Sequence, residues 1–475
     1  MFIKIFYLLV IIILVPFYLF APATMDKAVM SYLFILAFAC LSVYMFTKEK
    51  EINLKAQFFK HSTLFLIGYF IVHFQYYLDF ILGNAPLENP FIWINNNIVV
   101  GSMIISVIGL ACFFLGYFTY KKSKVKIKQK PEKVAKINYL IFISIFALVV
   151  FFMTVNPLYL AGFYGAEEMG SSATYAILIY SICIFSIIVQ NCRNMIVSGQ
   201  IPKNFKEYIK SQGYILLTIM GVYLISVIVS GDRGPLITFS VFYLGGYFFV
   251  TRKKLSSKSL LVFIFVGASF ITLLGVVRNQ EKKVSFSERL LMGINNKAAF
   301  EEEETPSFFP QTQELASSVR TLHTTIDYIP QKHDFFYGRF QFQQITVVVP
   351  FFNIFSVLLF EDQSVKSAGS SSFVTWVNHG DNPTSGDGTS CLADFYFDFG
   401  LIGVIIGMFL FGYYIRFWEI NTFVNEMPTL LVHIFAMVYL SNALYIPRSS
   451  VLFELKTVIW VYFLLKVNKA IFQKN

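Results

Sequence analysis

Three arginines stand at the ends of long apolar segments, where their side chains could bind an anion. Arg233 lies in the short turn Gly231-Asp-Arg-Gly-Pro235, Arg278 follows an apolar run, and Arg448 precedes another. A planar guanidinium donates two parallel hydrogen bonds to one phosphate, so arginine suits the capture of phosphate or pyrophosphate. Single arginines at such positions often only reach toward lipid headgroups, and Gly, Asp and Pro favour turns in any protein. Three of them together favour the anion-binding interpretation.

Acidic residues accompany the same segments. Asp79 ends one apolar run, and Asp394 and Asp398 begin another. Glu454 and Lys456 lie inside a further run, where ionisable groups are costly and usually have a function. Because these two are only two positions apart on an expected helix, they should face different directions and pair with other segments.

The composition assigns these residues to a membrane protein. The chain of 475 residues is 56% hydrophobic and only 14% charged, against about 25% charged residues in soluble domains. Unpaired backbone groups are too costly in hydrocarbon, so each apolar segment should be a helix, and we expect an all-α polytopic protein with about twelve transmembrane helices. The expected spans are Phe2–Phe20, Ala28–Phe46, Ser62–Leu82, Asn97–Tyr120, Asn138–Asn156, Ser172–Asn191, Gly213–Ser230, Pro235–Thr251, Ser259–Val277, Ala393–Tyr414, Pro428–Tyr445 and Ser450–Val467.

The distribution of lysine and arginine orients these spans. Every second loop is basic, whereas the loops Gly83–Asn96 and Leu158–Ser171 contain neither residue type. Basic loops remain in the cytoplasm, so both termini are expected there and the long loop is expected outside. The net charge of +10 therefore indicates topology and not nucleic-acid binding. The basic loops are 48–60, 121–136, 193–210 and 252–258.

The chain divides into helices at 1–278, a large periplasmic or extracellular loop at 279–390, and three further helices at 391–475. Loops longer than about 15 residues usually fold or carry function. Apolar residues at helical spacing from Leu315 to Ile329 predict a helix on the outer surface. The apolar stretch Ile345–Phe360 is short for a span, which favours a re-entrant or interfacial segment. Glu301–Glu304 is most simply a solvated acidic run, and the cysteine spacing predicts no metal site.

An ordered set of motifs resembles a known family. The set comprises the turn Gly231–Pro235, Ile329-Pro330 followed by Phe336-Tyr-Gly338, Val349-Pro350, Pro383-Thr-Ser-Gly-Asp-Gly-Thr-Ser390 and Ala393-Asp-Phe-Tyr-Phe-Asp-Phe-Gly-Leu-Ile-Gly403. It is similar to the bacterial oligosaccharide repeat-unit polymerases, the Wzy-type O-antigen polymerases. The similarity in hydropathy covers the whole chain, and the motifs lie chiefly between Ser230 and Gly412. The family often has glutamate where Asp394 stands, so the resemblance carries less weight at that position.

The resemblance implies a membrane glycosyltransferase of the bacterial inner membrane that needs no cofactor. A growing glycan on undecaprenyl pyrophosphate would be transferred, at the outer face, to the non-reducing end of a newly flipped lipid-linked repeat unit. The product would be O-antigen or a capsule-like polymer. The lipid-linked oligosaccharide would be the substrate, with a flippase and a chain-length regulator as partners.

The expected chemistry assigns roles to the polar residues. Arg233 and Arg278 would stabilise the charge that develops on the leaving pyrophosphate. A base must take the proton of the attacking sugar hydroxyl, and His379 and Asp381 are candidates, with Asp394 next. A single histidine in a loop is, however, more often a surface residue. Aromatic side chains of the loop could stack on sugar rings or simply pack. Residues expected to bind substrate are Arg339, Asp394, Arg448, Trp376 and Asp79.

Two other functions fit part of the pattern. A ligase that transfers finished glycan to a different acceptor would use the same pyrophosphate chemistry, but it would not lengthen chains. A transporter or flippase would place polar groups near the bilayer midplane and often shows repeated halves. Here the charged groups gather at one edge, and the long loop has no counterpart elsewhere in the chain.

The expected topology can be tested by labelling. A cysteine placed at Ser307 should react with a thiol reagent that cannot cross the membrane, because the long loop is expected outside. A cysteine at Ser123, in the lysine-rich loop, should react only after the membrane is opened. Reversed labelling would invert the topology and rule out an active site at the outer face.

Overall fold

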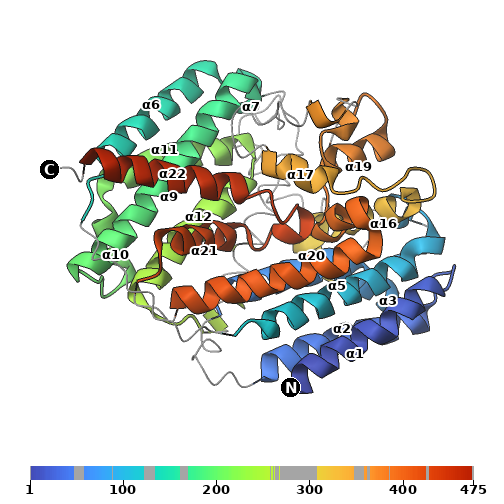
Figure 1. Cartoon of the computed structure of the whole chain (residues 1–475). Coiled ribbons are helices and arrows are strands. Elements are labelled where there is room, and N and C mark those ends of the chain that lie inside the picture. The colour runs from blue at the N-terminus through green and yellow to red at the C-terminus, as the bar shows by residue number, and fades with distance from the viewer. Residues whose placement is uncertain are drawn as a thin grey trace.

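The structure of the chain is a computed structural model (Figure 1). In the part described, the regular structure is helical and contains no β-strand, which confirms the expected all-α fold. The described residues are 2–47, 58–87, 89–121, 134–160, 169–256, 258–259, 261–262, 267, 307–346, 358–360, 364–383, 386–423 and 427–472.

Several of these helices are long and apolar enough to cross a bilayer, so the chain is a multi-pass membrane protein. Helices α10 (Phe205–Gln212) and α11 (Tyr214–Ser230) meet the same test as a pair, although the pair is bent by 94°. Helices α6 (Asn138–Thr154) and α21 (Leu430–Asn442) are shorter and apolar, and α22 is Leu455–Phe472. The seven long helices are α1 (Phe2–Leu19), α2 (Lys27–Phe46), α3 (His61–Leu82), α5 (Val99–Thr119, extended by η2, Asn96–Ile98), α9 (Ser171–Ser198), α12 (Gly234–Thr251) and α20 (Cys391–Phe423).

Each expected span other than Ser259–Val277 therefore coincides with a helix. That ninth span lies mostly outside the described residues, as do Arg278, the acidic run 301–304 and most of the apolar stretch 345–360. The shorter elements are α4 (Pro90–Trp93), α7 (Pro157–Leu160), η4 (Pro310–Thr312), α15 (Gln313–Ala316), α16 (Val319–Tyr328), α17 (Arg339–Thr346), η5 (Val365–Ser367), α19 (Ser370–His379) and η6 (Ile446–Arg448).

Helix α5 forms the centre of the fold and runs along α20 (Figure 1). Nearly every side chain of α5 is buried, and α1 and α2 pack on it from the side away from α20. The two central helices approach closely because glycines face the opposing backbone. A Cβ atom on Gly116 would overlap the carbonyl of Phe409, and one on Gly412 would overlap the carbonyl of Phe113. Small residues at helix contacts permit this close packing in membrane proteins.

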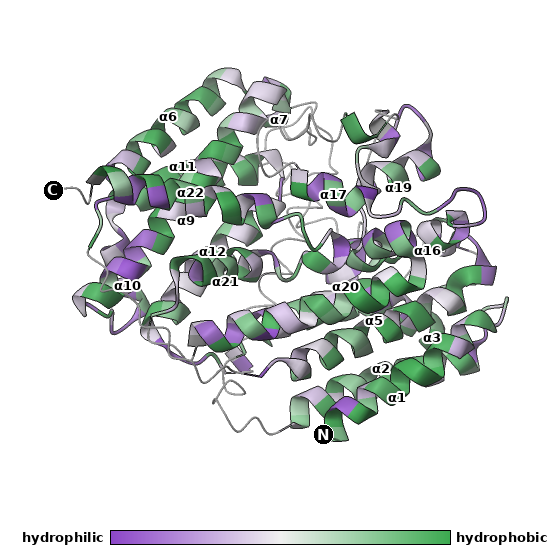
Figure 2. Cartoon of the chain, in the orientation of Figure 1, coloured by the Kyte–Doolittle hydropathy of each residue, from purple (hydrophilic) through white to green (hydrophobic). Residues whose placement is uncertain are grey.

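Described residues of three basic loops meet at one end of the molecule. Arg193 donates to the carbonyl oxygen of Pro428 over 3.1 Å, Arg252 donates to the carbonyl of Thr422, and the backbone of Phe58 pairs with Leu255. Helices α16, α17 and α19 lie at the other end, and both termini lie away from them (Figure 1). Hydrophilic residues mark α10 and α16–α17, while α1, α2 and α5 are hydrophobic along their length (Figure 2). We call these the basic end and the loop end.

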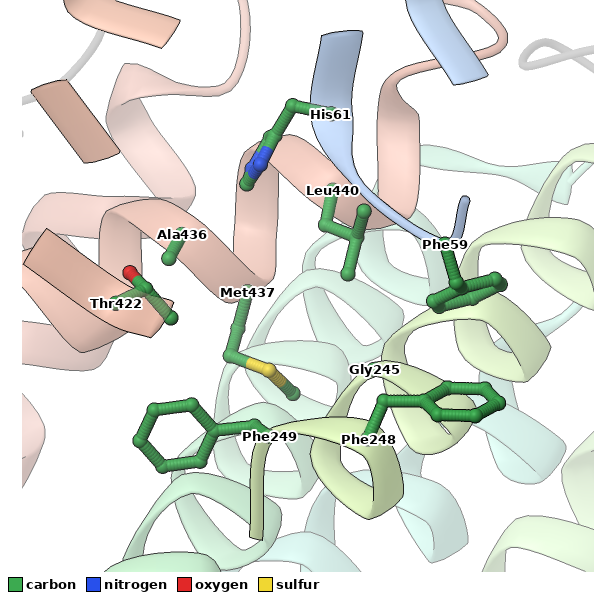
Figure 3. A pocket seen from close by; sticks show the side chains of 9 residues that line it. All are labelled: Phe59, His61, Gly245, Phe248, Phe249, Thr422, Ala436, Met437 and Leu440. Carbon is green, nitrogen blue, oxygen red and sulfur yellow. The ribbon is translucent and has the colours of Figure 1, made fainter. Parts of the chain in front are cut away.

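The basic end is closely packed around a buried carboxylate. Glu419 of α20 accepts hydrogen bonds from the backbone N–H and hydroxyl of Ser62, over 2.8 and 2.7 Å, and from Tyr117. It thereby caps the start of α3, where negative charge is favourable. A cavity of about 20 Å³ lies nearby, lined by His61, Met437 and apolar neighbours (Figure 3). It is large enough for about one water molecule and too small for a sugar.

Helix α20 is interrupted near the loop end. Phe399 has φ −143° and ψ 18°, and Gly400 has φ 60° and ψ −146°, a conformation suited to glycine. The long loop pairs with the backbone there, because Phe336 N–H donates to the carbonyl oxygen of Phe397 and Tyr337 N–H donates to that of Asp398, over 2.9 and 3.0 Å. Irregular backbone within a membrane-spanning segment is tolerated where other parts of the protein cover it. The interruption therefore provides the docking place of the loop.

The helix expected between Leu315 and Ile329 occurs as α15 and α16. It is more deeply packed than a helix on a surface, because residues Val319 to Ile326 of α16 are all buried. His323 bonds Tyr77 of α3 over 2.8 Å, and Thr324 donates to Asn378 of α19 over 3.0 Å. The polar side of this helix thus has protein partners in place of water.

Substituting Gly412 with alanine should destabilise the protein, because the new methyl group would push α20 away from α5. Gly221→Ala is the matched control, since no atom lies within 4 Å of a Cβ at that position and alanine favours the helix by up to about 1 kcal/mol. We expect a lower thermal midpoint in detergent for Gly412→Ala and an unchanged or higher one for the control. Equal midpoints would contradict the close α5–α20 contact.

Candidate functional site

A cavity with several polar lining residues lies at the loop end, between the start of α12, the end of α21 and the segment that leads from η6 into α22. Its volume is about 230 Å³, which can accept part of a sugar-phosphate. It contains a guanidinium, a carboxylate, a phenol and several hydroxyl groups. The lining residues are Gly234, Thr238, Asn442, Tyr445, Ile446, Arg448, Ser449, Ser450, Phe453 and Glu454.

The structure places one of the three predicted arginines, Arg448, in the wall of this cavity, and a second, Arg233, directly before the lining residue Gly234. No ion pair joins Arg448 to another described residue. Arg233 precedes α12 and forms an ion pair with Glu314 of α15; its side chain is 11% exposed. Burial raises the pKa of Tyr445 to about 12, against the opposing effects of Arg448 and Arg233. Both guanidiniums therefore act on the same phenol and share one electrostatic environment.

Asp394 lies behind the cavity wall and is fully buried. Its carboxylate accepts hydrogen bonds from Ser370 of α19 over 2.6 Å, Gln341 and Gln344 of α17 over 2.6 and 3.0 Å, and Ser450 over 2.8 Å. Ser450 also lines the cavity. A carboxylate can accept about four hydrogen bonds, and four side chains already donate to this one. Asp394 fixes the wall of the site and has little capacity left for a ligand.

The predicted base His379 forms a pair with Asp387. Its Nε2 lies 3.1 Å from Asp387 Oδ1, while Asn378 donates to Oδ2 over 2.6 Å and Arg320 lies 3.5 Å from the same oxygen. A Cβ at the next residue, Gly388, would lie 4.0 Å from the carbonyl oxygen of Arg448. The tract before α20 therefore lies beside η6, although His379 is not among the residues that line the cavity.

The sequence interpretation did not single out Asp387. It lies within the Pro383–Ser390 tract, and only its position between two glycines distinguishes it there. Its importance is visible only once the fold brings α16 and α19 around it. A carboxylate with three polar partners orients each of them and is costly to remove.

Other predicted residues lie apart from the cavity. Asp381 accepts a hydrogen bond from Trp376 Nε1 over 2.8 Å, and Lys366 Nζ lies 4.7 Å from the Trp376 ring centroid. Arg339 begins α17, with its guanidinium carbon 4.8 Å from the Phe360 ring centroid. These residues line none of the cavity walls described, so a substrate contact for them stays a prediction.

Asp79 has a visible structural partner. It is buried at the end of α3, where its oxygens accept from the Ser307 hydroxyl over 2.6 Å and from the Phe308 backbone over 2.9 Å. Both oxygens hold the start of the described loop segment against α3. Substrate binding by Asp79 likewise stays a prediction.

Glu454 and Lys456 lie differently from the sequence expectation. Because α22 begins at Leu455, Glu454 lies in the turn that precedes this helix and lines the cavity. Lys456 Nζ lies 3.8 Å from the Phe453 ring centroid. Within the described ranges, neither residue forms the ion pair with another span that we expected.

The fold and the site define a multi-pass membrane protein with a polar, arginine-bearing cavity at one end of its helices. The family of O-antigen polysaccharide polymerases, Wzy, matches residues 2–473. This match covers nearly the entire chain, so the protein belongs to that family and the resemblance seen in the sequence is confirmed. Membership supports a polysaccharide polymerase role and a glycosyltransferase-like enzyme. No curated protein and no solved structure shows a significant match to the chain.

Replacing Asp394 by asparagine should destabilise the loop end, because one acceptor oxygen becomes an N–H₂ group that faces hydrogen-bond donors. The expected loss is about 1–3 kcal/mol, measured as a lower thermal midpoint in detergent. Asp381→Asn serves as the control, since its side chain is exposed and can still accept from Trp376. Similar midpoints for the two variants would contradict the structural role of Asp394.

Proposed function

We propose that the protein polymerises oligosaccharide repeat units carried on undecaprenyl pyrophosphate, at the outer face of the bacterial inner membrane. The growing glycan leaves its pyrophosphate lipid and is joined to the non-reducing end of the next lipid-linked unit. The family acts on lipid-linked repeat units, which supports this substrate class. A flippase would supply the units and a chain-length regulator would limit the product.

The observation that carries the proposal is the pair of arginines at the cavity of the loop end. A lipid-linked pyrophosphate lies at the headgroup level and gains negative charge as the sugar departs. Arg448, which no described carboxylate neutralises, and Arg233, near the same tyrosine, supply positive charge there. Preorganised charge aimed at a developing anion is usually the largest contribution to such catalysis. Arg278 would add to it from the predicted ninth span.

The proposed orientation places the loop end on the periplasmic or extracellular side of the membrane. The described residues of the basic loops 48–60, 193–210 and 252–258 lie at the opposite end, and basic loops remain cytoplasmic. In this arrangement 279–390 is the outer loop between helices 1–278 and 391–475, and both termini are cytoplasmic. The cavity at the loop end would then open where flipped repeat units arrive.

Two other functions are less well supported. A ligase shares the leaving group and the site, and only the length of the product separates it from a polymerase. A transporter would need a substrate site near the middle of the membrane. In the described residues the larger cavity lies at one end of the helices, and the smaller one holds about one water molecule.

Arg233→Ala should abolish long-chain product and leave single repeat units on the acceptor lipid, because the leaving pyrophosphate loses one guanidinium. Arg233→Lys should recover only part of the activity, since an ammonium group cannot bind a pyrophosphate with two parallel hydrogen bonds. Arg278→Ala should behave like Arg233→Ala. The measurement is the polysaccharide ladder on a gel, at matched amounts of protein in the membrane.

Glu314→Gln separates binding of the pyrophosphate from the structural ion pair. This variant removes the negative charge of Glu314, which pairs with Arg233, and keeps the guanidinium. The polymer ladder should therefore persist. If Arg233 acted only by holding α15, Glu314→Gln and Arg233→Ala would be equally inactive. A normal ladder for Arg233→Ala would refute its role at the leaving group.

A further inference from the structure

We propose that Glu454 is the base that accepts the proton of the attacking sugar hydroxyl, an inference that rests on the proposed polymerase reaction. Glu454 lines the same cavity as Arg448. A single chamber therefore offers a cation for the departing pyrophosphate and a carboxylate for the incoming hydroxyl. No other carboxylate lines this cavity among the described residues.

The turn that carries Glu454 has a defined position. Tyr439 of α21 donates from its hydroxyl to the carbonyl oxygen of Val451 over 3.1 Å. The backbone N–H of Val458 donates to the carbonyl oxygen of Glu454 over 3.1 Å, so the residue directly before α22 accepts the first hydrogen bond of that helix. The carboxylate is thus presented by backbone that is bonded on both sides, as a proton acceptor requires.

The electrostatic surroundings suit this task. Burial raises the pKa of Glu454 to about 7, while Lys456 and the hydroxyl of Thr457 act in the opposite direction. A carboxylate with a pKa near neutral pH is available as an anion and is basic enough to take a proton. The other charged and titratable groups described around the cavity are Arg448 of η6, Tyr439 of α21, Tyr445, Asp232 and Arg233 of the turn before α12, and Glu314 of α15.

The predicted bases are less suitable. Asp394 already accepts hydrogen bonds from four side chains and is fully buried. Asp381 accepts from Trp376, and His379 pairs with Asp387. None of these lines the cavity that contains Arg448. Proton transfer requires direct reach or one bridging water, so position favours Glu454.

The proposed step is a glycosyl transfer in which one bond to the anomeric carbon replaces another. The oxygen of the acceptor hydroxyl forms a bond to the anomeric carbon of the donor glycan, and the bond from that carbon to the pyrophosphate oxygen breaks. The electron pair of the broken bond leaves with the undecaprenyl pyrophosphate beside Arg448. The hydroxyl proton passes to the Glu454 carboxylate, which later releases it to water.

The test uses the full-length protein reconstituted in vesicles with purified undecaprenyl-pyrophosphate-linked repeat units. Glu454→Gln should lower the polymerisation rate at least about 100-fold, in line with the contribution of a positioned base, and leave lipid-substrate binding within about threefold of wild type. The wild-type rate should fall as the pH drops through about 7, because the carboxylate becomes protonated. Glu454→Asp should keep partial activity and this pH dependence.

Two further variants separate chemistry from structure. Glu454→Ala should regain activity with added formate, which a purely structural role would not allow. Glu207→Gln, at the basic end, should keep the normal rate. If Glu454→Gln polymerises at more than a tenth of the wild-type rate with an unchanged pH profile, Glu454 is not the base. If wild-type protein binds the lipid but never lengthens the glycan, the proposed polymerase reaction itself is wrong.

Discussion

The buried carboxylate of Asp394 is the constraint on which the loop end depends. A charge withdrawn from water is tolerated only when hydrogen bonds replace its hydration, and here they come from α17, α19 and the segment before α22. These elements are far apart in the sequence, yet each must lie at a fixed place for the carboxylate to be satisfied. Ser450 links this cluster to the cavity, because its hydroxyl donates to Asp394 and the same residue lines the cavity wall.

A second acid, one helical turn further on, extends the same principle. Asp398 accepts from the backbone N–H groups of Phe340 and Gln341, over 3.2 and 2.9 Å, and so caps α17. The break at Gly400 frees nearby carbonyls of α20 for the loop. Two carboxylates and one glycine thus make the start of a long apolar helix the support on which the long loop packs. A rigid platform of this kind is what a site needs to hold charged groups in position.

The sequence predicted the spans well because about 20 apolar residues are needed to cross a bilayer whatever their neighbours are. The sequence analysis placed Glu454 inside a helix, because the apolar run begins at Ser450. Hydropathy does not show that the helix itself, α22, begins only at Leu455. The burial of α16 was also unforeseen. Its threonines and histidine look suited to water, and only the partners Tyr77 and Asn378 explain why they are inside. Asp387 was overlooked for the same reason, since its partners converge only in the fold.

The two arginines at the cavity also differ in a way that the sequence could not show. Arg233 has Glu314 as a partner, so part of its charge is balanced before any ligand arrives. Arg448 has no described carboxylate partner, and the acid nearest along the chain, Glu454, has its pKa raised by burial. The pyrophosphate, which becomes more negative as the sugar departs, would therefore find net positive charge at Arg448. In the proposed reaction this difference in charge sets how the two substrates lie in the cavity. The pyrophosphate of the donor lies beside Arg448, and the neutral hydroxyl of the acceptor lies beside Glu454.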